Sequence, residues 1–238
     1  MNILAIGNSF SEDSTRYLHQ IARADKVNLQ ITNLFIGGCS LERHYRNMLS
    51  EQSVYELQTN GQRTGFTVSL KEALLNRKWD IITLQQASHF SFNESSYYPY
   101  ITELADYVRK MCPNVKIYIH QTWAYEQGSP RLLNVAKYES ADRMLEDAVA
   151  AYKKAAVSIN ADGIIPSGEM FARLLECGIE RIHRDTFHAS LGLGRYALAL
   201  LWYHILCGKD VSENTFCDLD EEVTPEQLLI VKSCVNGF

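Results

Sequence analysis

Positive charge is scarce in this sequence, and long apolar runs are missing. The 238 residues include 23 lysines and arginines against 28 aspartates and glutamates, giving a formal net charge of -5. No basic field is available to hold a polyanion, so we expect no nucleic-acid partner and no anionic membrane surface. The longest apolar stretch, Tyr196–Leu206, is well short of the roughly 18 residues that a membrane span needs. The sequence therefore predicts a soluble protein with a small or neutral partner.

Closely paired cysteines are also absent. The six cysteines are widely scattered, with no CxxC pair and no neighbouring histidine pair, so neither a zinc site nor a disulfide framework is predicted. No basic stretch leads into an apolar signal core, because Met1–Gly7 already has the pattern of a short strand. We expect reduced thiols and a cytoplasmic location.

Internal repeats, low-complexity tracts and linkers rich in proline, glycine or serine are missing as well. Hydrophobic residues make up 46% of the chain and charged residues 21%, which is the balance of an ordinary globular protein. At roughly 100–200 residues per domain, the length fits one large domain. We therefore expect residues 1–238 to form a single domain.

The chain does contain a regular alternation of short apolar runs and helical patterns. This alternation is typical of parallel β-α-β units whose helices cover both faces of a sheet. The expected strands are Asn2–Ile6, Leu29–Phe35, Asp80–Leu84, Val115–His120 and Gly163–Ile165. They predict an α/β fold with a five-stranded, doubly wound parallel sheet.

Helices are expected between these strands and after the last one. Apolar residues recur at helical spacing over Ser14–Ala24, Ser69–Arg77, Tyr97–Met111 and Glu139–Val157. A strongly apolar helix is predicted over Leu191–Cys207, and Thr224-Pro225 opens a last short helix. Residues 54–68 interrupt the alternation, and their Asn60-Gly61 pair predicts a hairpin inserted at the sheet's edge.

Polar residues gather in the loops after the strands, where an open α/β sheet binds its ligands. Gly7-Asn8-Ser9 follows the first strand, and a small residue before serine allows a sharp turn that exposes the hydroxyl. Serine also leads at helix N-caps, so Ser9 alone is a weak signal. Gly37-Gly38 follows the second strand and brings backbone N–H groups to a ligand, or simply forms a turn. Gln85-Gln86 follows the third strand, and these residues are either carboxamide donors to a ligand or ordinary loop residues.

The most specific signal lies near the C-terminus. Asp185 and His188 are three residues apart, just before the apolar helix. In a turn, this spacing lets the carboxylate accept from one ring nitrogen while the other nitrogen faces a nucleophile. A structural histidine is the simpler interpretation, and His183 with Asp185 and His188 is a possible metal-ligand set. No further ligand pair supports a metal, so none is predicted.

Taken together, these loops resemble the SGNH, or GDSL-type, serine hydrolases. Gly7-Asn8-Ser9-Phe10 matches the family's nucleophile block, Gly38 its glycine block, and Asp185-Thr186-Phe187-His188 its terminal Asp-x-x-His block. Asn8 replaces the usual aspartate beside the nucleophile. The family's Gly-x-Asn-Asp block is absent, and Leu84-Gln85-Gln86-Ala87-Ser88 stands in its place. This form is similar to a branch in which a glutamine amide supplies the third oxyanion donor.

The resemblance implies a flavodoxin-like, three-layer α/β/α sandwich that hydrolyses esters without a cofactor. Ser9 would be the nucleophile, His188 the general base and Asp185 the residue that orients it. The implied oxyanion hole consists of the N–H groups of Ser9 and Gly38 with the amide of Gln85, which we favour over Gln86.

Two other classes of protein remain alternatives. One is a catalytically inactive carbohydrate-binding module on the same fold, because a fold does not guarantee chemistry. The other is a thiol-dependent hydrolase that uses Cys39, which follows Gly38 in the chain.

The substrate prediction starts from aromatic and polar side chains in the loops after the third and fourth strands. Flat aromatic faces beside polar donors suit a sugar, although such rings often pack beneath loops instead. The predicted substrate-binding residues are Gln86, His89, Trp123 and Tyr125. Because similar SGNH enzymes commonly deacetylate carbohydrates, we expect a small-molecule or saccharide substrate with a short-chain acyl ester, and O-acetyl groups on carbohydrates are the leading class. The sequence does not predict the oligomeric state.

Overall fold

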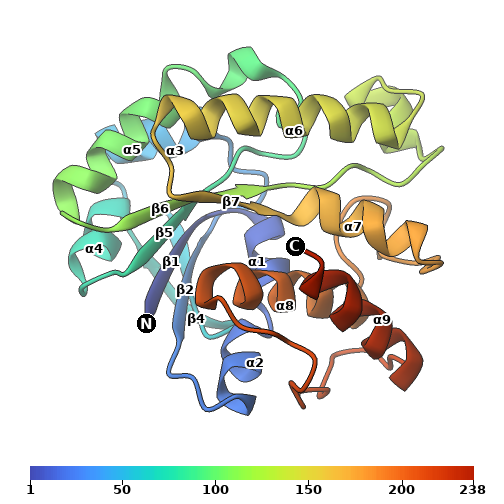
Figure 1. Ribbon diagram of the computed structural model, residues 1–238. Coiled ribbons are helices and arrows are strands. Elements are labelled where there is room, and N and C mark those ends of the chain that lie inside the picture. The colour runs from blue at the N-terminus through green and yellow to red at the C-terminus, as the bar shows by residue number, and fades with distance from the viewer.

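The chain folds around one mixed β-sheet with helices on both faces (Figure 1). The computed structural model describes residues 1–238. The strand order is β4-β3-β2-β1-β5-β6-β7. The five neighbouring strands β2, β1, β5, β6 and β7 run parallel to one another. The predicted α/β class is confirmed.

The parallel strands form at the short apolar runs of the sequence. Alternate side chains of the first strand enter different cores, Ile3 and Ala5 on one face of the sheet, Leu4 and Ile6 on the other. Burial on both faces explains why such strands lack polar alternation. The bounds are β1 Asn2–Gly7, β2 Gln30–Phe35, β5 Ile81–Leu84, β6 Lys116–Gln121 and β7 Gly163–Pro166.

The prediction of five purely parallel strands is wrong, because a hairpin extends the sheet to seven. Strands β3 (Tyr55–Thr59) and β4 (Gln62–Val68) pair antiparallel with each other, and β3 pairs antiparallel with β2. Their two-residue turn is Asn60-Gly61, with positive φ at both positions. Glycine is required at the second position, since a Cβ there would lie 2.1 Å from the Arg16 carbonyl oxygen.

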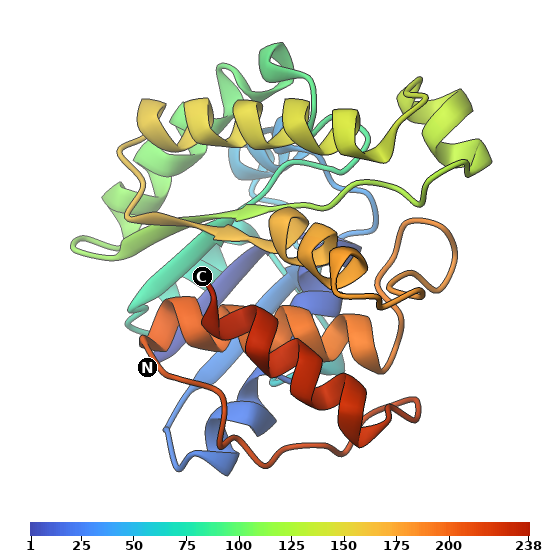
Figure 2. The same ribbon diagram turned by 45° about the vertical axis from the view of Figure 1, so that its right-hand side comes forward.

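Helices divide between the two faces of the sheet, as the two views show (Figures 1 and 2). One face carries α3 (Leu41–Ser50), α4 (Leu70–Leu75), α5 (Tyr100–Met111) and α6 (Ala141–Ser158). The other carries α1 (Ser9–Thr15), α2 (Leu18–Ala24), α7 (Ser167–Glu176), α8 (Leu193–Cys207) and α9 (Pro225–Asn236). The short helices η1 (Glu94–Tyr97) and η2 (Arg131–Ala136) lie in the loops after β5 and β6.

The helix predicted over Ser14–Ala24 is two helices, and the first of them begins earlier. The Asn8 side chain accepts the Phe10 N–H and starts α1 at Ser9. A second helix, α2, begins at Leu18. Helix α8 is buried along most of its length and ends at Gly208, whose φ is 63°. No helix in the structure has the length and apolarity to cross a membrane.

The topology places a switch point beside β1. The chain runs from β1 to β2 on one side and later returns to β5 on the other, so the loops after β1 and β5 diverge at this point. Open α/β sheets bind ligands at such a switch point, beyond the carboxyl ends of the strands.

Candidate active site

Ser9 lies at this switch point, at the first position of α1. Residue Asn8 has extended backbone geometry, which turns the chain sharply from strand to helix. Gly7 permits the turn, because a Cβ there would lie 2.5 Å from Ser11 Oγ and 2.7 Å from Gln85 Oε1. Ser9 itself stays half-buried, so its hydroxyl remains accessible.

Ser9, His188 and Asp185 form a hydrogen-bonded chain. His188 Nε2 lies 2.8 Å from Ser9 Oγ, and His188 Nδ1 lies 2.8 Å from Asp185 Oδ2. The His188 backbone N–H also donates to Asp185 Oδ1, at 2.9 Å. Burial raises the pKa of Asp185, but the hydrogen bonds from His188 outweigh it and leave the pKa below its usual value. The carboxylate is therefore ionised at neutral pH and orients the imidazole.

The turn that carries His188 is held by the loop after β6. Thr186 has a left-handed backbone, with φ at 75°, and its carbonyl accepts the Glu126 N–H at 2.8 Å. The Phe187 carbonyl accepts from Trp123 Nε1 at 2.7 Å. The Phe187 ring packs on the His188 ring, with centroids 3.7 Å apart. These contacts fix the position of the imidazole.

A buried carboxylate, Asp13, joins this turn to the helix of the nucleophile. Its oxygens accept from Arg184 Nη1 at 2.9 and 3.0 Å and from Arg195 Nε at 2.8 Å. The Ala189 N–H donates to it as well, at 3.2 Å. Arg184 and Ala189 flank the Asp185–His188 segment, and Asp13 is four residues after Ser9 on α1. Asp13 thus ties the two halves of the site together.

Sequence analysis missed Asp13 because its partners are more than 170 residues away in the chain. The only local signal is its spacing: residues i and i+4 of a helix share one face, so an acidic residue four positions after Ser9 faces the same way. Helices α1 and α8 pack against each other, on the same face of the sheet (Figure 2).

The loop after β2 brings Gly38 next to Ser9. Asn8 Nδ2 donates to the Cys39 carbonyl at 3.1 Å, so the neighbours of Ser9 and Gly38 touch directly. Gly38 has a positive φ of 61°, and its N–H donates to no group in the chain. The space where a Cβ would stand is open. Gly38 therefore keeps an unpaired N–H in the loop that contacts Asn8, the residue before Ser9.

The two predicted amide donors are both buried and hydrogen-bonded. Gln85 Nε2 donates to Asn8 Oδ1 at 2.8 Å, and this is the only acceptor of its two N–H bonds. The Gln86 nitrogen donates to the carbonyl and hydroxyl of Ser96, and its oxygen accepts from two backbone N–H groups, those of Leu41 and Ala87. Both polar atoms of the Gln86 side chain are therefore paired within the chain, and its role as a binding residue stays a prediction.

His120 determines which way the Gln85 amide points. Burial lowers the pKa of His120 to about 3, so the ring is neutral and has one N–H. Its Nδ1 lies 2.8 Å from Gln85 Oε1, an atom that can only accept, so this nitrogen bears the hydrogen. Nε2 lies 3.2 Å from the Ser14 hydroxyl, which also donates to the Phe10 carbonyl at 2.9 Å. With the Gln85 oxygen on His120, its nitrogen faces Asn8.

Trp123 and Tyr125 lie beneath the surface and present no open face for a sugar. Trp123 stacks on Phe10 at 4.1 Å, and Tyr125 hydrogen-bonds to Ser88 Oγ at 3.0 Å. Each is 1% exposed, and their role in substrate binding stays a prediction. Among the four predicted residues, only His89 is partly exposed.

Cys39 and His183 lie outside the hydrogen-bonded chain. Cys39 is fully buried, which raises its thiol pKa to about 12, and its sulfur contacts His44 rather than His188. His183 Nε2 hydrogen-bonds to the Ala124 carbonyl. Neither side chain hydrogen-bonds to Ser9, His188 or Asp185.

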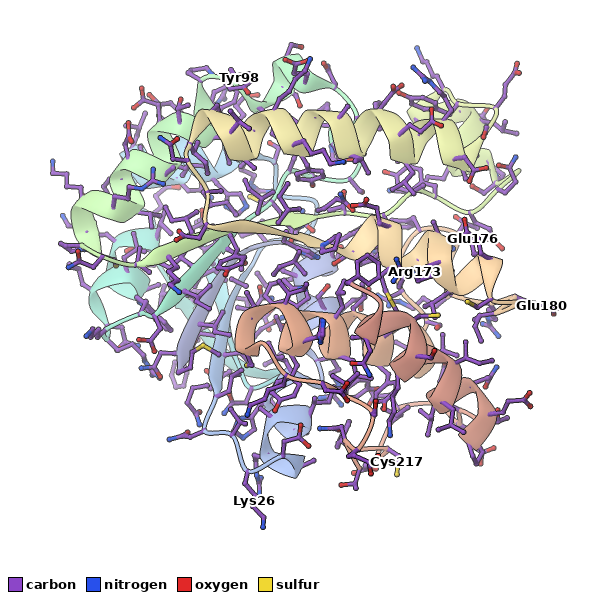
Figure 3. All side chains as sticks on the ribbon, viewed as in Figure 1. Lys26, Tyr98, Arg173, Glu176, Glu180 and Cys217 are labelled. Atoms are coloured by element: carbon purple, nitrogen blue, oxygen red, sulfur yellow. The ribbon has the colours of Figure 1, made fainter.

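A separate cavity of about 370 Å³ opens between α7 and the loop after β6. Its lining includes Tyr125, Phe171 and His183, and Glu180, which lines it as well, is labelled beyond the end of α7 in Figure 3. Ser9 and His188 do not line this cavity. The seryl hydroxyl therefore opens onto a different part of the surface.

Residues 2–233 match a family described as a domain of unknown function, DUF4886. The chain belongs to the DUF4886 family. Among solved structures, a DUF4886 protein from Bacteroides uniformis ATCC 8492 is 32% identical, with a TM-score of 0.91 over 100% of this chain and 93% of that one. Among proteins with curated descriptions, none matches.

More distant structures share the fold of this DUF4886 chain. A candidate SGNH hydrolase from Slackia heliotrinireducens is 21% identical, with a TM-score of 0.62 over 87% of this chain and 98% of the other. Axe2, an acetylxylan esterase from Geobacillus stearothermophilus, is 14% identical, with a TM-score of 0.54 over 85% and 92%. The three-layer fold is thus that of SGNH hydrolases.

Proposed function

We propose that this DUF4886 protein is a serine esterase of the SGNH type. The observation that carries the proposal is the Ser9–His188–Asp185 chain, in which both hydrogen bonds of the imidazole measure 2.8 Å. A seryl hydroxyl, an imidazole and a carboxylate in this order are the elements of acyl transfer. The shared fold of SGNH hydrolases supports the same conclusion.

In this mechanism His188 Nε2 accepts the Ser9 proton while Ser9 Oγ attacks the ester carbonyl carbon. The tetrahedral intermediate collapses when the C–O bond to the alcohol breaks, and the imidazolium returns its proton to that alcohol. Water then attacks the acyl-enzyme in the same way, releasing the acid and restoring Ser9. Asp185 keeps the proton on Nδ1 throughout.

The oxyanion of the intermediate would be bound by the N–H groups of Ser9 and Gly38 and by the remaining N–H of Gln85. Each such donor contributes about 3–4 kcal/mol to transition-state stabilisation in other serine hydrolases. Gln85 has a second task in this proposal, since its other N–H holds Asn8 and thereby the turn before Ser9.

Labelling with a fluorophosphonate tests the proposal directly. We expect covalent modification at Ser9, and Ser9→Ala should stay folded while esterase turnover falls at least about a thousandfold. Cys39→Ala is the matched control and should retain turnover, because that thiol is buried and unable to ionise at neutral pH. An unlabelled Ser9 in a protein that binds glycans would instead favour the inactive binding module.

The proposed substrates are short-chain acyl esters, with O-acetyl groups on saccharides as the leading class. The aromatic residues predicted to hold a sugar are buried, so this part of the proposal rests on the acetylxylan esterase that shares the fold. A chain-length series of p-nitrophenyl esters tests it. Catalytic efficiency should be highest with acetate and low with octanoate, and an optimum at octanoate would exclude a short-acyl enzyme.

A further inference from the structure

Arg131 is a half-buried arginine without an acceptor. Its Nε is buried and has no hydrogen-bond partner, and no carboxylate lies within ion-pairing distance of its guanidinium. The other half-buried arginines all bind carboxylates or backbone carbonyls, namely Arg16, Arg109, Arg173, Arg184 and Arg195. Leaving a buried donor unmatched costs free energy, so an unmatched donor on a partly exposed side chain suggests a ligand.

Arg131 lies beside the proposed catalytic residues. Its guanidinium carbon is 3.5 Å from the centre of the Phe187 ring, and that ring centre is 3.7 Å from the centre of the His188 ring. The positive charge is therefore within about 7 Å of the imidazole, a range in which a charge acts strongly on a bound anion. Arg131, Phe187, His188 and Ser9 are all partly exposed.

The surroundings hold the guanidinium without neutralising it. Phe187 covers one face at 3.5 Å, and the Tyr125 ring is 5.5 Å away. Aromatic faces stabilise a cation but leave the N–H fork at the rim free to bind. His89 is also near: burial lowers its pKa, and the Arg131 charge lowers it further, so this imidazole is neutral and does not compete for an anion.

Local backbone structure supports the same reading. Arg131 is the first residue of η2, a six-residue π-helix. Such turns are rare and frequently occur at functional sites.

We infer that Arg131 binds an anionic group, a carboxylate or a phosphate, carried by the ester substrate next to the bond that Ser9 attacks. The inference rests on the proposed esterase function. It narrows the proposed substrate class from short-acyl esters in general to short-acyl esters that carry an anionic group. A guanidinium fork accommodates either group through two parallel N–H···O bonds.

Acetate release from matched aryl acetates tests the inference. The probes are 4-acetoxybenzoate, 4-acetoxyphenyl phosphate and the neutral 4-acetoxybenzamide. The measured quantity is the ratio of kcat/KM for an anionic ester to that for the neutral one within each variant, so a general loss of turnover cancels. Arg131→Met should lower this ratio at least tenfold, and Arg131→Lys should lower it less, because it keeps the charge without the fork. Whichever anion shows the larger effect identifies the group.

Arg23→Met is the control, since Arg23 is an exposed arginine on α2. It should leave the ratio unchanged. An equal fall in kcat/KM for all three esters in Arg131→Met would mean that Arg131 only supports Phe187. An unchanged kcat/KM for all three would mean that Arg131 does not contact the substrate. In both cases the ratio stays the same and the inference is overturned.

Binding of the products separates this inference from the esterase proposal. Calorimetric titration with 4-hydroxybenzoate and 4-hydroxyphenyl phosphate needs no turnover. At least one should bind, at least tenfold more tightly to the natural protein than to Arg131→Met, with 4-hydroxybenzamide as the neutral comparison. If no ester is hydrolysed but this difference appears, only the esterase proposal fails. If neither anion binds better than the amide, the anion site is wrong.

Discussion

Asparagine at position 13 would remove the one buried negative charge that links α1 to the turn of His188. The Asp13 side chain is 0% exposed, and its two arginine partners are 23% and 13% exposed. Burial raises the pKa of Asp13, and Arg195 and Arg184 oppose that rise. Removing one partner of a buried ion pair costs about 3–5 kcal/mol, because the other charge loses its counterion. The arginines can be partly rehydrated, so we expect about 3 kcal/mol for Asp13→Asn.

Urea unfolding followed by circular dichroism measures this loss, together with the melting temperature. For a chain of this length, 3 kcal/mol corresponds to a fall in Tm of about 6–12 °C. Asp220→Asn is the matched control, since Asp220 contacts Arg16 and Arg195 but is 29% exposed. It should cost about 1 kcal/mol.

Activity distinguishes a positioning role for Asp13 from a purely structural one. Well below the lowered Tm, Asp13→Asn should reduce kcat strongly and change KM little, because the carboxylate holds the histidine turn without touching substrate. A stability loss below about 1 kcal/mol would refute the ion-pair reasoning. A kcat equal to that of the natural protein, with stability reduced, would show that Asp13 supports the fold alone.

Hydrogen bonds of Gln85, Asp220 and Trp123 give three more expected outcomes. Gln85→Ala should lower kcat far more than it changes KM, since an oxyanion donor acts in the transition state; a loss confined to Gln86→Ala would reverse this assignment. The hydrogen bond from Arg16 lowers the pKa of Asp220 to about 2, below its value in the unfolded chain. The Asp220 carboxylate therefore stabilises the folded state fully above about pH 4, and this contribution is lost as the pH falls towards about 2. The stability difference between the natural protein and Asp220→Asn should shrink over that range, and a constant difference would contradict it. Trp123→Phe removes the N–H that holds the Phe187 carbonyl and should cost about 1 kcal/mol in urea unfolding, whereas no change would show that the bond is replaceable.

The elements that could be predicted from the sequence are those that local patterns encode. Short apolar runs located the five parallel strands, and Asn60-Gly61 located the β3–β4 turn. The sequence placed the hairpin at the sheet's edge but did not reveal which edge it joins, because β3, the strand that pairs with β2, is only partly buried and its pattern does not specify a neighbour. The sheet therefore has two more strands than predicted.

Local encoding also explains which site residues were found. Ser9 follows a strand directly, and Asp185 and His188 share one turn, so their spacing is visible in the sequence. The direction of a carboxamide is not visible in the sequence. The Gln85 nitrogen donates to Asn8, and the Gln85 oxygen hydrogen-bonds to His120, which lies 35 residues later in the chain. The burial of the aromatic residues could not be predicted for a similar reason. The sequence around Trp123 is the same whether its ring faces a ligand or packs under a loop.

The two parts of the proposed triad come from opposite ends of the chain, and α1 is the frame that relates them. Beneath Ser9, a line of hydrogen bonds runs through Gln85 and His120 to Ser14. Toward His188, Asp13 binds Arg184 and the Ala189 N–H. Both networks end on the same helix.

This double anchoring accounts for the unusual composition of α1, whose sequence SFSEDST has little intrinsic preference for a helix. Serine, threonine and aspartate favour caps and turns over helix interiors, because their side chains compete for backbone hydrogen bonds. In α1 they are buried, where apolar residues would pack at least as well. Apolar side chains could not hold a histidine turn and a strand-to-helix turn in register with each other. Directional hydrogen bonds can, and any small displacement of α1 then moves Ser9 and His188 together, so their 2.8 Å contact is kept.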